Sequence, residues 1–167
     1  GLVIDIKLNN DTEIRGKDLL LLGAGGAISG ALPALINEHP SSITIVNRSI
    51  NKANILKKNL GSIVPIETYS YEDLKGDFDI IINGTSLSLS DELPPIRESN
   101  IRRGGLCYDM FYKNTKTAFE SWAASSQAGG VTNGLGMLVE QAAESFLVWT
   151  GIRPSTLEVL QKVRKAG

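Results

Sequence analysis

A glycine-rich stretch lies between an apolar block at residues 18–22 and a segment of helical periodicity at residues 27–38. Its members are Gly23, Ala24, Gly25, Gly26 and Ala27. A helix N-terminus presents unpaired backbone N–H groups and the positive end of a dipole, and glycines let a phosphate approach the backbone closely. The pattern therefore favours a pyrophosphate cradle formed by the N–H groups of residues 24–27. A tight strand-to-helix turn without a ligand is the alternative, since Ile28 stands where a G-x-G-x-x-G motif has its third glycine.

Basic and hydroxyl side chains follow the second apolar block, residues 43–46. In NAD-binding folds an acidic residue about 20 residues after the glycines binds the ribose 2'-hydroxyl. This chain has no acid there, and the residues in its place are Asn47, Arg48, Ser49 and Lys52. An Arg and a Lys would bind a 2'-phosphate that a carboxylate would repel, so the sequence predicts NADP as the cofactor. Alternatively, these are ordinary surface residues, with Ser49 capping a helix.

Further candidate binding residues stand at or after the ends of three later apolar blocks. They are Asn83, Gly84, Thr85 and Ser86 after residues 78–82, Asp109, Met110 and Tyr112 at the end of residues 105–109, and Asn133, Gly134 and Gln141 after residues 129–132. Ligands of open α/β sheets bind outside the carboxyl ends of the strands, so Thr85 and the Tyr112 hydroxyl are candidates for ligand contact. An Asn-Gly turn, core packing of Met110 and a boundary role for Gln141 are the alternatives.

The blocks that would place these residues alternate between strand and helix. Strands are predicted at residues 18–22, 43–46, 63–66, 78–82, 105–109 and 129–132, and helices at 27–38, 50–60, 117–127 and 136–149. This alternation predicts an α/β fold, a doubly wound six-stranded parallel sheet of the Rossmann type with strand order 3-2-1-4-5-6. In the helix at 136–149 we expect an apolar face opposite Glu140 and Glu144, made of Leu138, Val139, Ala142, Ala143, Phe146 and Leu147.

Length and composition limit the classes of function. The 167 residues are 42% hydrophobic with a formal net charge of -1, which fits one domain and gives no reason to expect nucleic acid or a membrane as partner. With only Cys107 and His39, the chain has neither an internal disulfide nor a zinc site of the usual Cys/His kind, and no metal is expected. His39 is predicted to lie on the surface, away from the ligand edge. No apolar run approaches the roughly 20 residues of a membrane span, so we expect a cytoplasmic protein.

Five stretches taken together resemble the C-terminal cofactor domain of the shikimate dehydrogenase family. They are LLLLGAGGAISGAL, NRSINKA, DIIINGTS, YDMFYKNTKT and NGLGMLVEQAA, in the order that the family has them. The family's glycine turn reads G-A-G-G-A, which Gly23 to Ala27 match, whereas Gly84 stands where Ala is usual. The resemblance implies reduction of 3-dehydroshikimate to shikimate with NADPH, in the pathway to aromatic amino acids.

The resemblance also implies roles for individual residues. Gly23 to Ala27 would hold the pyrophosphate, and Asn47, Arg48, Ser49 and Lys52 the adenosine phosphate. Met110 and Gly134 would lie by the nicotinamide, while Tyr112 and Gln141 would reach the substrate.

The family's catalytic lysine and aspartate belong to a first, substrate-binding domain. We therefore expect residues 1–167 to form a single NADP-binding domain, a fragment of a two-domain enzyme that binds cofactor without turnover. Lys17 and Asp18 lie at the amino end of a predicted strand, far from the ligand edge, and do not take the catalytic roles. A quinate/shikimate dehydrogenase of broader specificity using NAD, or a non-catalytic nucleotide-binding module, are the alternatives.

Overall fold

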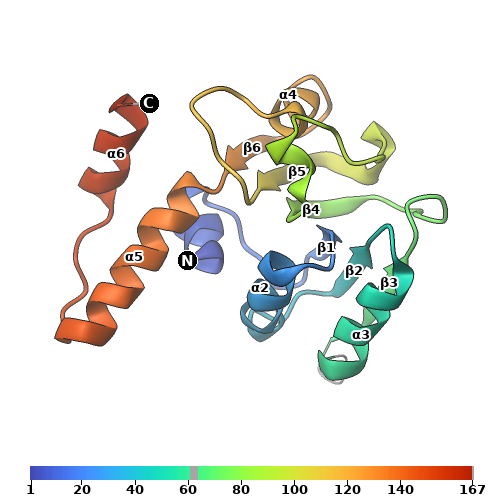
Figure 1. The fold of residues 1–167 in the computed structure, drawn as a ribbon, viewed down its shortest axis with the longest axis horizontal. Helices are drawn as coiled ribbons and strands as arrows, with labels where there is room; N and C mark the ends of the chain where they lie inside the picture. The colour runs from blue at the N-terminus through green and yellow to red at the C-terminus, as the bar shows by residue number, and fades with distance from the viewer. Residues whose placement is uncertain (61–63, 167) are drawn as a thin grey trace.

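A parallel sheet forms the centre of the protein in a computed structural model that describes residues 1–60 and 64–166 (Figure 1). Within these ranges the sheet has six strands, β1 (Asp18–Leu22), β2 (Ser42–Val46), β3 (Ile66–Tyr69), β4 (Phe78–Asn83), β5 (Ile101–Asp109) and β6 (Gly130–Asn133). Their order is β3-β2-β1-β4-β5-β6 and every pairing is parallel. The predicted fold class and strand order are confirmed.

The central strand β1 is apolar throughout because both faces of the sheet are covered. Leu19 and Leu21 belong to one buried cluster, and Leu20 and Leu22 to another, as the alternation of side chains along a strand requires. All four are fully buried. A strand of this kind loses the polar and apolar alternation of a half-exposed strand, which explains the unbroken LLLL run.

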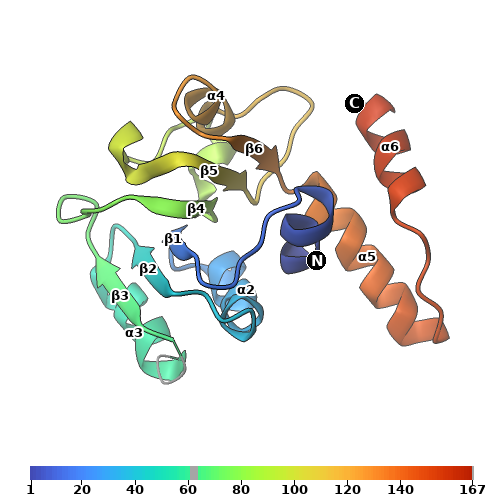
Figure 2. The same ribbon diagram turned by 180° about the vertical axis from the view of Figure 1, so that it is seen from behind.

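Helices cover the two faces of the sheet, as Figures 1 and 2 show from opposite sides. They are α2 (Gly26–Asn37), α3 (Ile50–Leu60) and α4 (Ala118–Ala124). Of the two last helices, α5 (Leu135–Thr150) packs against the start of the chain, and α6 (Leu157–Ala166) lies beside α5, away from the sheet. Residues of α2 and α3 pack in the cluster of Leu19 and Leu21, whereas α4 packs in the cluster of Leu20 and Leu22. The chain begins with a short helix, α1 (Leu2–Ile4), which continues into a π-helical turn, η1 (Asp5–Asn9). None of the helices in the described ranges has the length and apolar character that crossing a membrane requires.

One predicted strand, 18–22, has the observed bounds, three others differ by a single residue at one or both ends, and the third and fifth differ by more. The third starts at Ile66 because Pro65 has no N–H to donate to a ladder, although its carbonyl accepts from the Ile43 N–H at 2.9 Å. Of the predicted range 63–66, residue 63 lies outside the described residues, as does the predicted helix end at residue 61. The fifth strand starts four residues early, at Ile101, and continues through Gly104 at a positive φ of 81° beside a register shift in its pairing with β4.

The predicted apolar face of α5 is correct for Val139 and Ala143, which are buried, and wrong for its exposed members and for Glu140. Leu138 and Phe146 are 46% and 44% exposed, whereas Glu140 is only 1% exposed. The Glu140 carboxylate accepts from Arg153 Nη2 at 2.9 Å and from Asn9 Nδ2 at 3.2 Å. Hence α5 turns a paired carboxylate toward η1, which periodicity within α5 could not reveal, because both partners come from other segments.

A second buried carboxylate joins η1 to the sheet. Asp5 is fully buried and accepts hydrogen bonds from the Tyr108 hydroxyl in β5 and from Asn9 Nδ2. A Cβ on Gly136 would overlap the Asp5 carboxylate, so a glycine is needed where α5 passes η1. These contacts fix the start of the chain against β5 and α5.

We expect Tyr108→Phe to lower the free energy of unfolding by about 1–3 kcal/mol, because it removes a donor from a buried carboxylate. Urea denaturation measures the change. Tyr69→Phe is the matched control, since the Tyr69 hydroxyl donates to Glu67 at an exposed position, and we expect it to stay within about 0.5 kcal/mol of the parent. Equal losses in the two variants would show that the Asp5 pairing contributes nothing specific.

Candidate functional site

The start of α2 is open to an anion. Gly25 occupies the position before the helix without any side-chain hydrogen bond to its first turn, and Gly25, Gly26 and Ala27 are exposed. A Cβ on Gly25 or Gly26 would meet no protein atom within 4 Å, so packing inside the protein does not require glycine at either position. The start of α2 therefore leaves room beside Gly25 and Gly26 for a ligand, and the N–H groups of a helix's first turn have no partner within the helix itself.

Gly23 is required by the fold itself. Its φ is +101°, and a Cβ there would lie 3.3 Å from both the Gly84 carbonyl oxygen and Thr85 Cγ2. A glycine is the residue that adopts this conformation without strain. The turn after β1 thus lies directly against the loop after β4, which brings Thr85 to the predicted phosphate cradle.

Ile28 and Gly84 are complementary in size. Ile28 is fully buried, and a Cβ on Gly84 would lie 2.6 Å from Ile28 Cγ1 and 2.7 Å from its Cδ1. The third glycine of a G-x-G-x-x-G turn allows close packing of helix against strand. Here the helix carries Ile28, and the glycine stands opposite it, at position 84 after β4. The two departures from the usual patterns, Ile28 and Gly84, therefore compensate each other in size.

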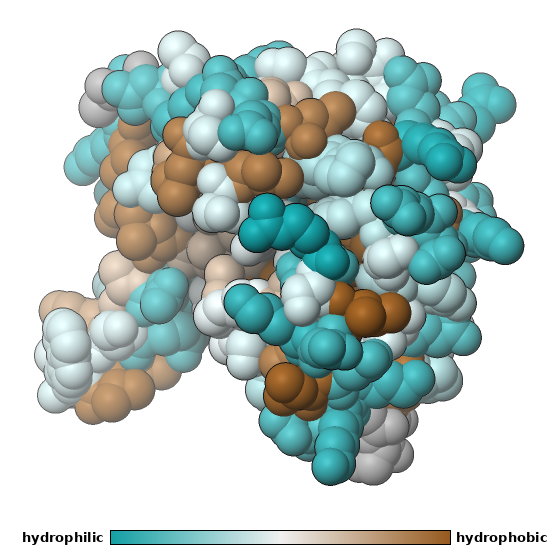
Figure 3. All heavy atoms as spheres, turned by 45° about the vertical axis from the view of Figure 1, so that its right-hand side comes forward, coloured by the Kyte–Doolittle hydropathy of each residue, from teal (hydrophilic) through white to brown (hydrophobic). Residues whose placement is uncertain are grey.

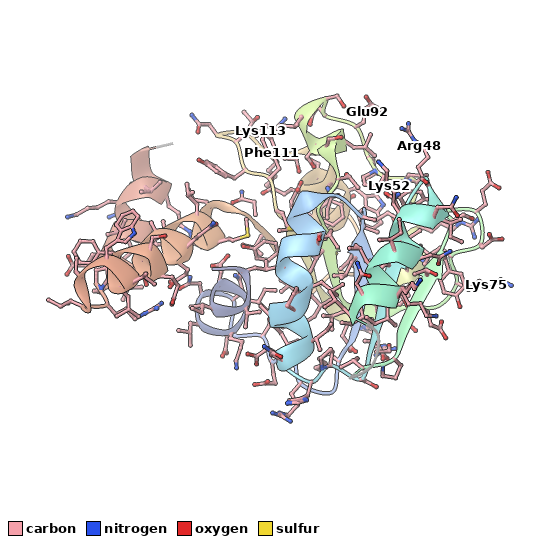
Figure 4. All side chains as sticks on the ribbon, turned by 60° about the horizontal axis from the view of Figure 1, so that its bottom comes forward. Arg48, Lys52, Lys75, Glu92, Phe111 and Lys113 are labelled. Atoms are coloured by element: carbon pink, nitrogen blue, oxygen red, sulfur yellow. The ribbon has the colours of Figure 1, made fainter. Side chains whose placement is uncertain are left out.

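Positive charge collects where α3 begins. Arg48 and Ser49 precede the helix, Lys52 lies in its first turn, and all three are exposed. Figure 4 shows Arg48 and Lys52 on the side of the molecule where α2 and α3 start. Neither forms an ion pair within residues 1–60 and 64–166, and the first turn of α3 has no acidic residue. Since the helix dipole adds further positive potential there, the arrangement favours a bound anion.

Asn47 shapes the loop that holds these cations. Its Nδ2 donates to the Ser49 carbonyl at 2.8 Å, and its backbone N–H donates to the Tyr69 carbonyl at 3.3 Å. The side chain therefore holds the turn between β2 and α3, and its remaining oxygen is left for a ligand.

A buried carboxylate lies at the carboxyl ends of β4 and β5. Asp109 is fully buried and accepts from the Ser88 and Thr117 hydroxyls at 2.7 Å each, and from the Phe111 N–H at 3.1 Å. Asn83 Nδ2 also approaches it at 3.4 Å. Burial raises the pKa of the Asp109 carboxyl, and the hydrogen bonds from Ser88 and Thr117 oppose that rise.

Hydrogen bonds extend this cluster to both sides. Asn83 Oδ1 accepts from the Thr85 N–H at 3.1 Å and from its hydroxyl at 2.8 Å. On the other side, the Thr117 N–H donates to Glu120 at 2.9 Å. The Glu120 carboxylate also accepts from Asn133 Nδ2 at 2.9 Å, at the end of β6. Asn83 and Asp109 are thus too buried to touch a ligand, and they hold exposed neighbours in place.

Three members of this cluster were not singled out in the sequence, namely Ser88, Thr117 and Glu120. The Thr117 hydroxyl accepts from the Glu120 N–H at the start of α4, and the Glu120 carboxylate accepts from the Thr117 N–H, so the pair forms a capping box. The T-x-x-E spacing before an apolar run is the signal that could have identified it. Nothing local marks Ser88, because its partner Asp109 is 21 residues away.

Met110 and Gly134 are neighbours, as their predicted common role requires. A Cβ on Gly134 would overlap the Met110 carbonyl oxygen, and the Gly134 N–H donates to the Phe111 carbonyl at 3.3 Å. Tyr112 follows, 41% exposed, on a cavity of about 710 Å³ that Lys113, Glu120 and Asn133 also line. The loops after β5 and β6 therefore meet at this cavity.

Gln141 lies apart from Tyr112. It is exposed on α5, is absent from the lining of that cavity, and has its Cβ beside Gly1 at the start of the chain. The structure thus brings Tyr112, Met110, Gly134 and Thr85 to one edge of the sheet, and it places Gln141 further along α5.

The residues that the sequence excluded from ligand binding lie at the other edge of the sheet, where the strands begin. The Asp18 carboxylate, at the start of β1, accepts from the Ser42 hydroxyl at 2.7 Å and pairs with Arg102 at 3.1 Å; both partners lower the pKa of Asp18. Lys17 Nζ is 3.9 Å from Asp79. His39 is exposed, and its carbonyl accepts from the Gly16 N–H just before β1. The prediction that Lys17, Asp18 and His39 lie away from the ligand edge is confirmed.

Comparison with known proteins identifies relatives along nearly the whole chain. The family model described as Shikimate / quinate 5-dehydrogenase matches residues 6–103, and that described as Shikimate 5'-dehydrogenase C-terminal domain matches residues 134–164. A relative from Cellvibrio japonicus named Shikimate dehydrogenase (NADP(+)) is 46% identical over 99% of this chain and 60% of its own length. One of the same name from Alkalilimnicola ehrlichii is 42% identical over 98% and 61%. The chain therefore spans about three fifths of these relatives.

Solved structures are similar to this chain over almost its whole length. An Ael1 enzyme from Pseudomonas putida matches with a TM-score of 0.88 at 40% identity, over 96% of this chain and 59% of its own. A shikimate dehydrogenase in complex with NADP+ matches with a TM-score of 0.77 at 28% identity, over 99% and 58%.

We expect Gly84→Ala to lower the free energy of unfolding by about 1–3 kcal/mol, because the new methyl group collides with Ile28. Ile28→Ala alone should cost about 2–5 kcal/mol through the cavity it leaves. The double variant should lose less than the sum of the two, by at least about 0.5 kcal/mol, because the methyl group introduced at position 84 then occupies vacated space. Denaturation of all four proteins tests this, and additive losses would contradict the pairing of the two sites.

Proposed function

The chain belongs to the shikimate/quinate 5-dehydrogenase family, and from this premise we propose that it is the NADP-binding domain of a two-domain enzyme. The whole enzyme would reduce 3-dehydroshikimate to shikimate with NADPH, in the biosynthesis of aromatic amino acids. The observation that carries the proposal is the positive charge of Arg48 and Lys52, which form no ion pair within the described residues, near the uncapped start of α2. A dinucleotide with a 2'-phosphate supplies anions for both places.

The adenosine half of the cofactor would bind across the starts of α2 and α3. The N–H groups of Gly23 to Ala27 would hold the pyrophosphate, since free space adjoins Gly25 and Gly26. Arg48 and Lys52 would hold the 2'-phosphate, with Ser49 and Asn47 completing the pocket. The lack of an acid at this position favours NADP over NAD, because a carboxylate there would bind a ribose hydroxyl.

The nicotinamide half would lie between the loops after β4, β5 and β6. Thr85, Met110 and Gly134 come from these loops, and the contact of Gly134 with Met110 supports a shared role. NADPH supplies a hydride when it is bound. Tyr112, exposed on the cavity next to these loops, would present its hydroxyl to the substrate. Gln141 does not line this cavity, so its proposed contact with the substrate from α5 rests on the family resemblance alone.

Within the described residues, the aspartate and the lysine of the segment that ends β5 and follows it, Asp109 and Lys113, are both engaged by other protein groups. Asp109 is buried with donors on both of its oxygens, and Lys113 Nζ is paired with Asp91 at 2.9 Å. These pairings support the proposal that the catalytic lysine and aspartate belong to the substrate-binding domain.

An exposed apolar surface on α5 and α6 is where that domain would pack. Val148 and Trp149 are 81% and 79% exposed, and Figure 3 shows hydrophobic atoms gathered on the side where α5 and α6 lie. The other large exposed apolar residues of this surface are Leu138, Phe146, Ile152, Leu157, Val159 and Val163. A contiguous apolar surface of this kind is typical of an interaction site.

We expect Arg48→Ala to weaken NADP+ binding by about 1.5–3 kcal/mol, because charge-assisted hydrogen bonds to the 2'-phosphate are lost. NAD+ binding should change little. Calorimetric titration with both cofactors measures this, and Arg15→Ala serves as control because Arg15 is exposed at the opposite edge of the sheet. Equal weakening for NADP+ and NAD+ would show that Arg48 supports the fold instead.

Absence of NADP+ binding by the unaltered chain, at millimolar cofactor, would leave a purely structural module.

We also expect the chain by itself to bind NADP+ without reducing it when shikimate is added. The reason is that the groups for proton transfer lie outside residues 1–167 in this proposal. Absorbance at the reduced nicotinamide band follows the reaction. Brisk reduction would overturn the assignment of the catalytic pair to another domain.

A further inference from the structure

We propose that Asp109 is a positioning residue that holds the loops of the nicotinamide half in their binding geometry without touching the cofactor. This inference rests on the proposed function of NADP binding. Asp109 gathers donors from four separate segments: the end of β4, the 3-10 helix η2 (Ser86–Leu89), the loop after β5 and the start of α4. No other part of the sheet edge joins these segments through one side chain in the described residues.

Burying a carboxylate in this space is energetically unfavourable. Removing a charged group from water costs several kcal/mol, and an apolar side chain of similar volume often stabilises a fold equally well. What an apolar side chain cannot do is bind four donors that approach from different directions. Asp109 does this with both oxygens engaged, Oδ2 by the Ser88 and Thr117 hydroxyls and Oδ1 by the Phe111 N–H and, more weakly, Asn83.

Two of the four donors, Asn83 and Phe111, lead directly to residues of the nicotinamide half. Asn83, beside Asp109, accepts two hydrogen bonds from Thr85, so the loop after β4 is fixed through it. The Phe111 N–H, donated to Asp109, fixes the segment that presents Met110 and Tyr112. Both loops therefore depend on the one carboxylate.

The third loop is reached through α4. Thr117 donates its hydroxyl to Asp109 and its N–H to Glu120, and Glu120 in turn accepts from Asn133. Asn133 Oδ1 accepts the Leu135 N–H at 3.2 Å, which fixes the turn around Gly134 at the start of α5. A continuous series of hydrogen bonds thus runs from Thr85 to Leu135 across the ends of β4, β5 and β6.

The loop proposed to hold the 2'-phosphate shares no hydrogen bond with this series in the described residues. Arg48 and Lys52 lie at the start of α3, next to β2, and the hydrogen bonds that hold their loop are those of Asn47, Ser49 and Lys52 with one another and with Tyr69. Loss of the Asp109 charge should therefore affect the nicotinamide end of NADP and spare the adenosine end. A general effect on folding would weaken both ends together.

The experiment compares two ligands on the variant Asp109→Asn. 2',5'-ADP contains the 2'-phosphate without the nicotinamide, and NADP+ contains both. In the variant we expect NADP+ affinity to fall about tenfold or more, because orientation of the bound groups is lost, while 2',5'-ADP affinity stays within about twofold. Isothermal titration on the full chain gives both constants.

Asp18→Asn is the matched control. Asp18 also accepts from a serine hydroxyl at 2.7 Å, but at the opposite edge of the sheet, and its replacement should leave both affinities unchanged. Should Asp109→Asn fail to fold, Ser88→Ala removes a single donor and should reduce NADP+ affinity about threefold with 2',5'-ADP unaffected.

The outcomes separate the two proposals. If the unaltered chain binds neither ligand, the proposed function fails. If it binds both and the folded Asp109→Asn variant loses both equally, or loses neither, the positioning role of Asp109 is overturned while the proposed function stands.

Discussion

The central strands of this sheet are buried on both faces, and that burial confines binding to the strand ends. Leu19 to Leu22 have no exposed surface, and helices from the two sides seal the sheet. Backbone groups at the ends of β1 and β4 are satisfied by neighbouring strands, as in the bond from the Gly23 N–H to the Val46 carbonyl at 2.7 Å. The first turn of α2 has no side-chain cap, and the open N–H groups of a helix start attract anions.

The two edges of the sheet handle charge differently. At the amino edge, Arg102 contacts the carboxylates of Asp18, Asp77 and Asp79, so positive and negative charges neutralise each other. At the carboxyl edge, the carboxylate of Asp109 is buried beneath the loops, whereas the cations Arg48 and Lys52 are exposed and unpaired in the described residues. This asymmetry makes the carboxyl edge the place where a ligand with several phosphates would gain most.

Local sequence was sufficient for the presence of the six strands and for the glycine turn, because each depends on residues adjacent in the chain. The strand order followed from the general topology of doubly wound sheets. Local sequence failed where the deciding partner is distant. The burial of Glu140 depends on Arg153 and Asn9, and the cluster of Asp109 depends on Ser88 and Thr117. The pairing of Ile28 with Gly84 joins a helix to a loop 56 residues away, so each appeared separately as an irregularity.

The central claim is that the carboxyl edge of this sheet binds NADP across its whole width. The most direct test is a crystal structure of the chain with NADP+ bound. We expect the pyrophosphate to accept hydrogen bonds from the N–H groups of residues 24–27, and the 2'-phosphate to accept from Arg48. We expect the nicotinamide to lie between Thr85, Met110 and Gly134. A dinucleotide bound at any other edge, or one whose 2'-phosphate points away from Arg48 and Lys52, would contradict it.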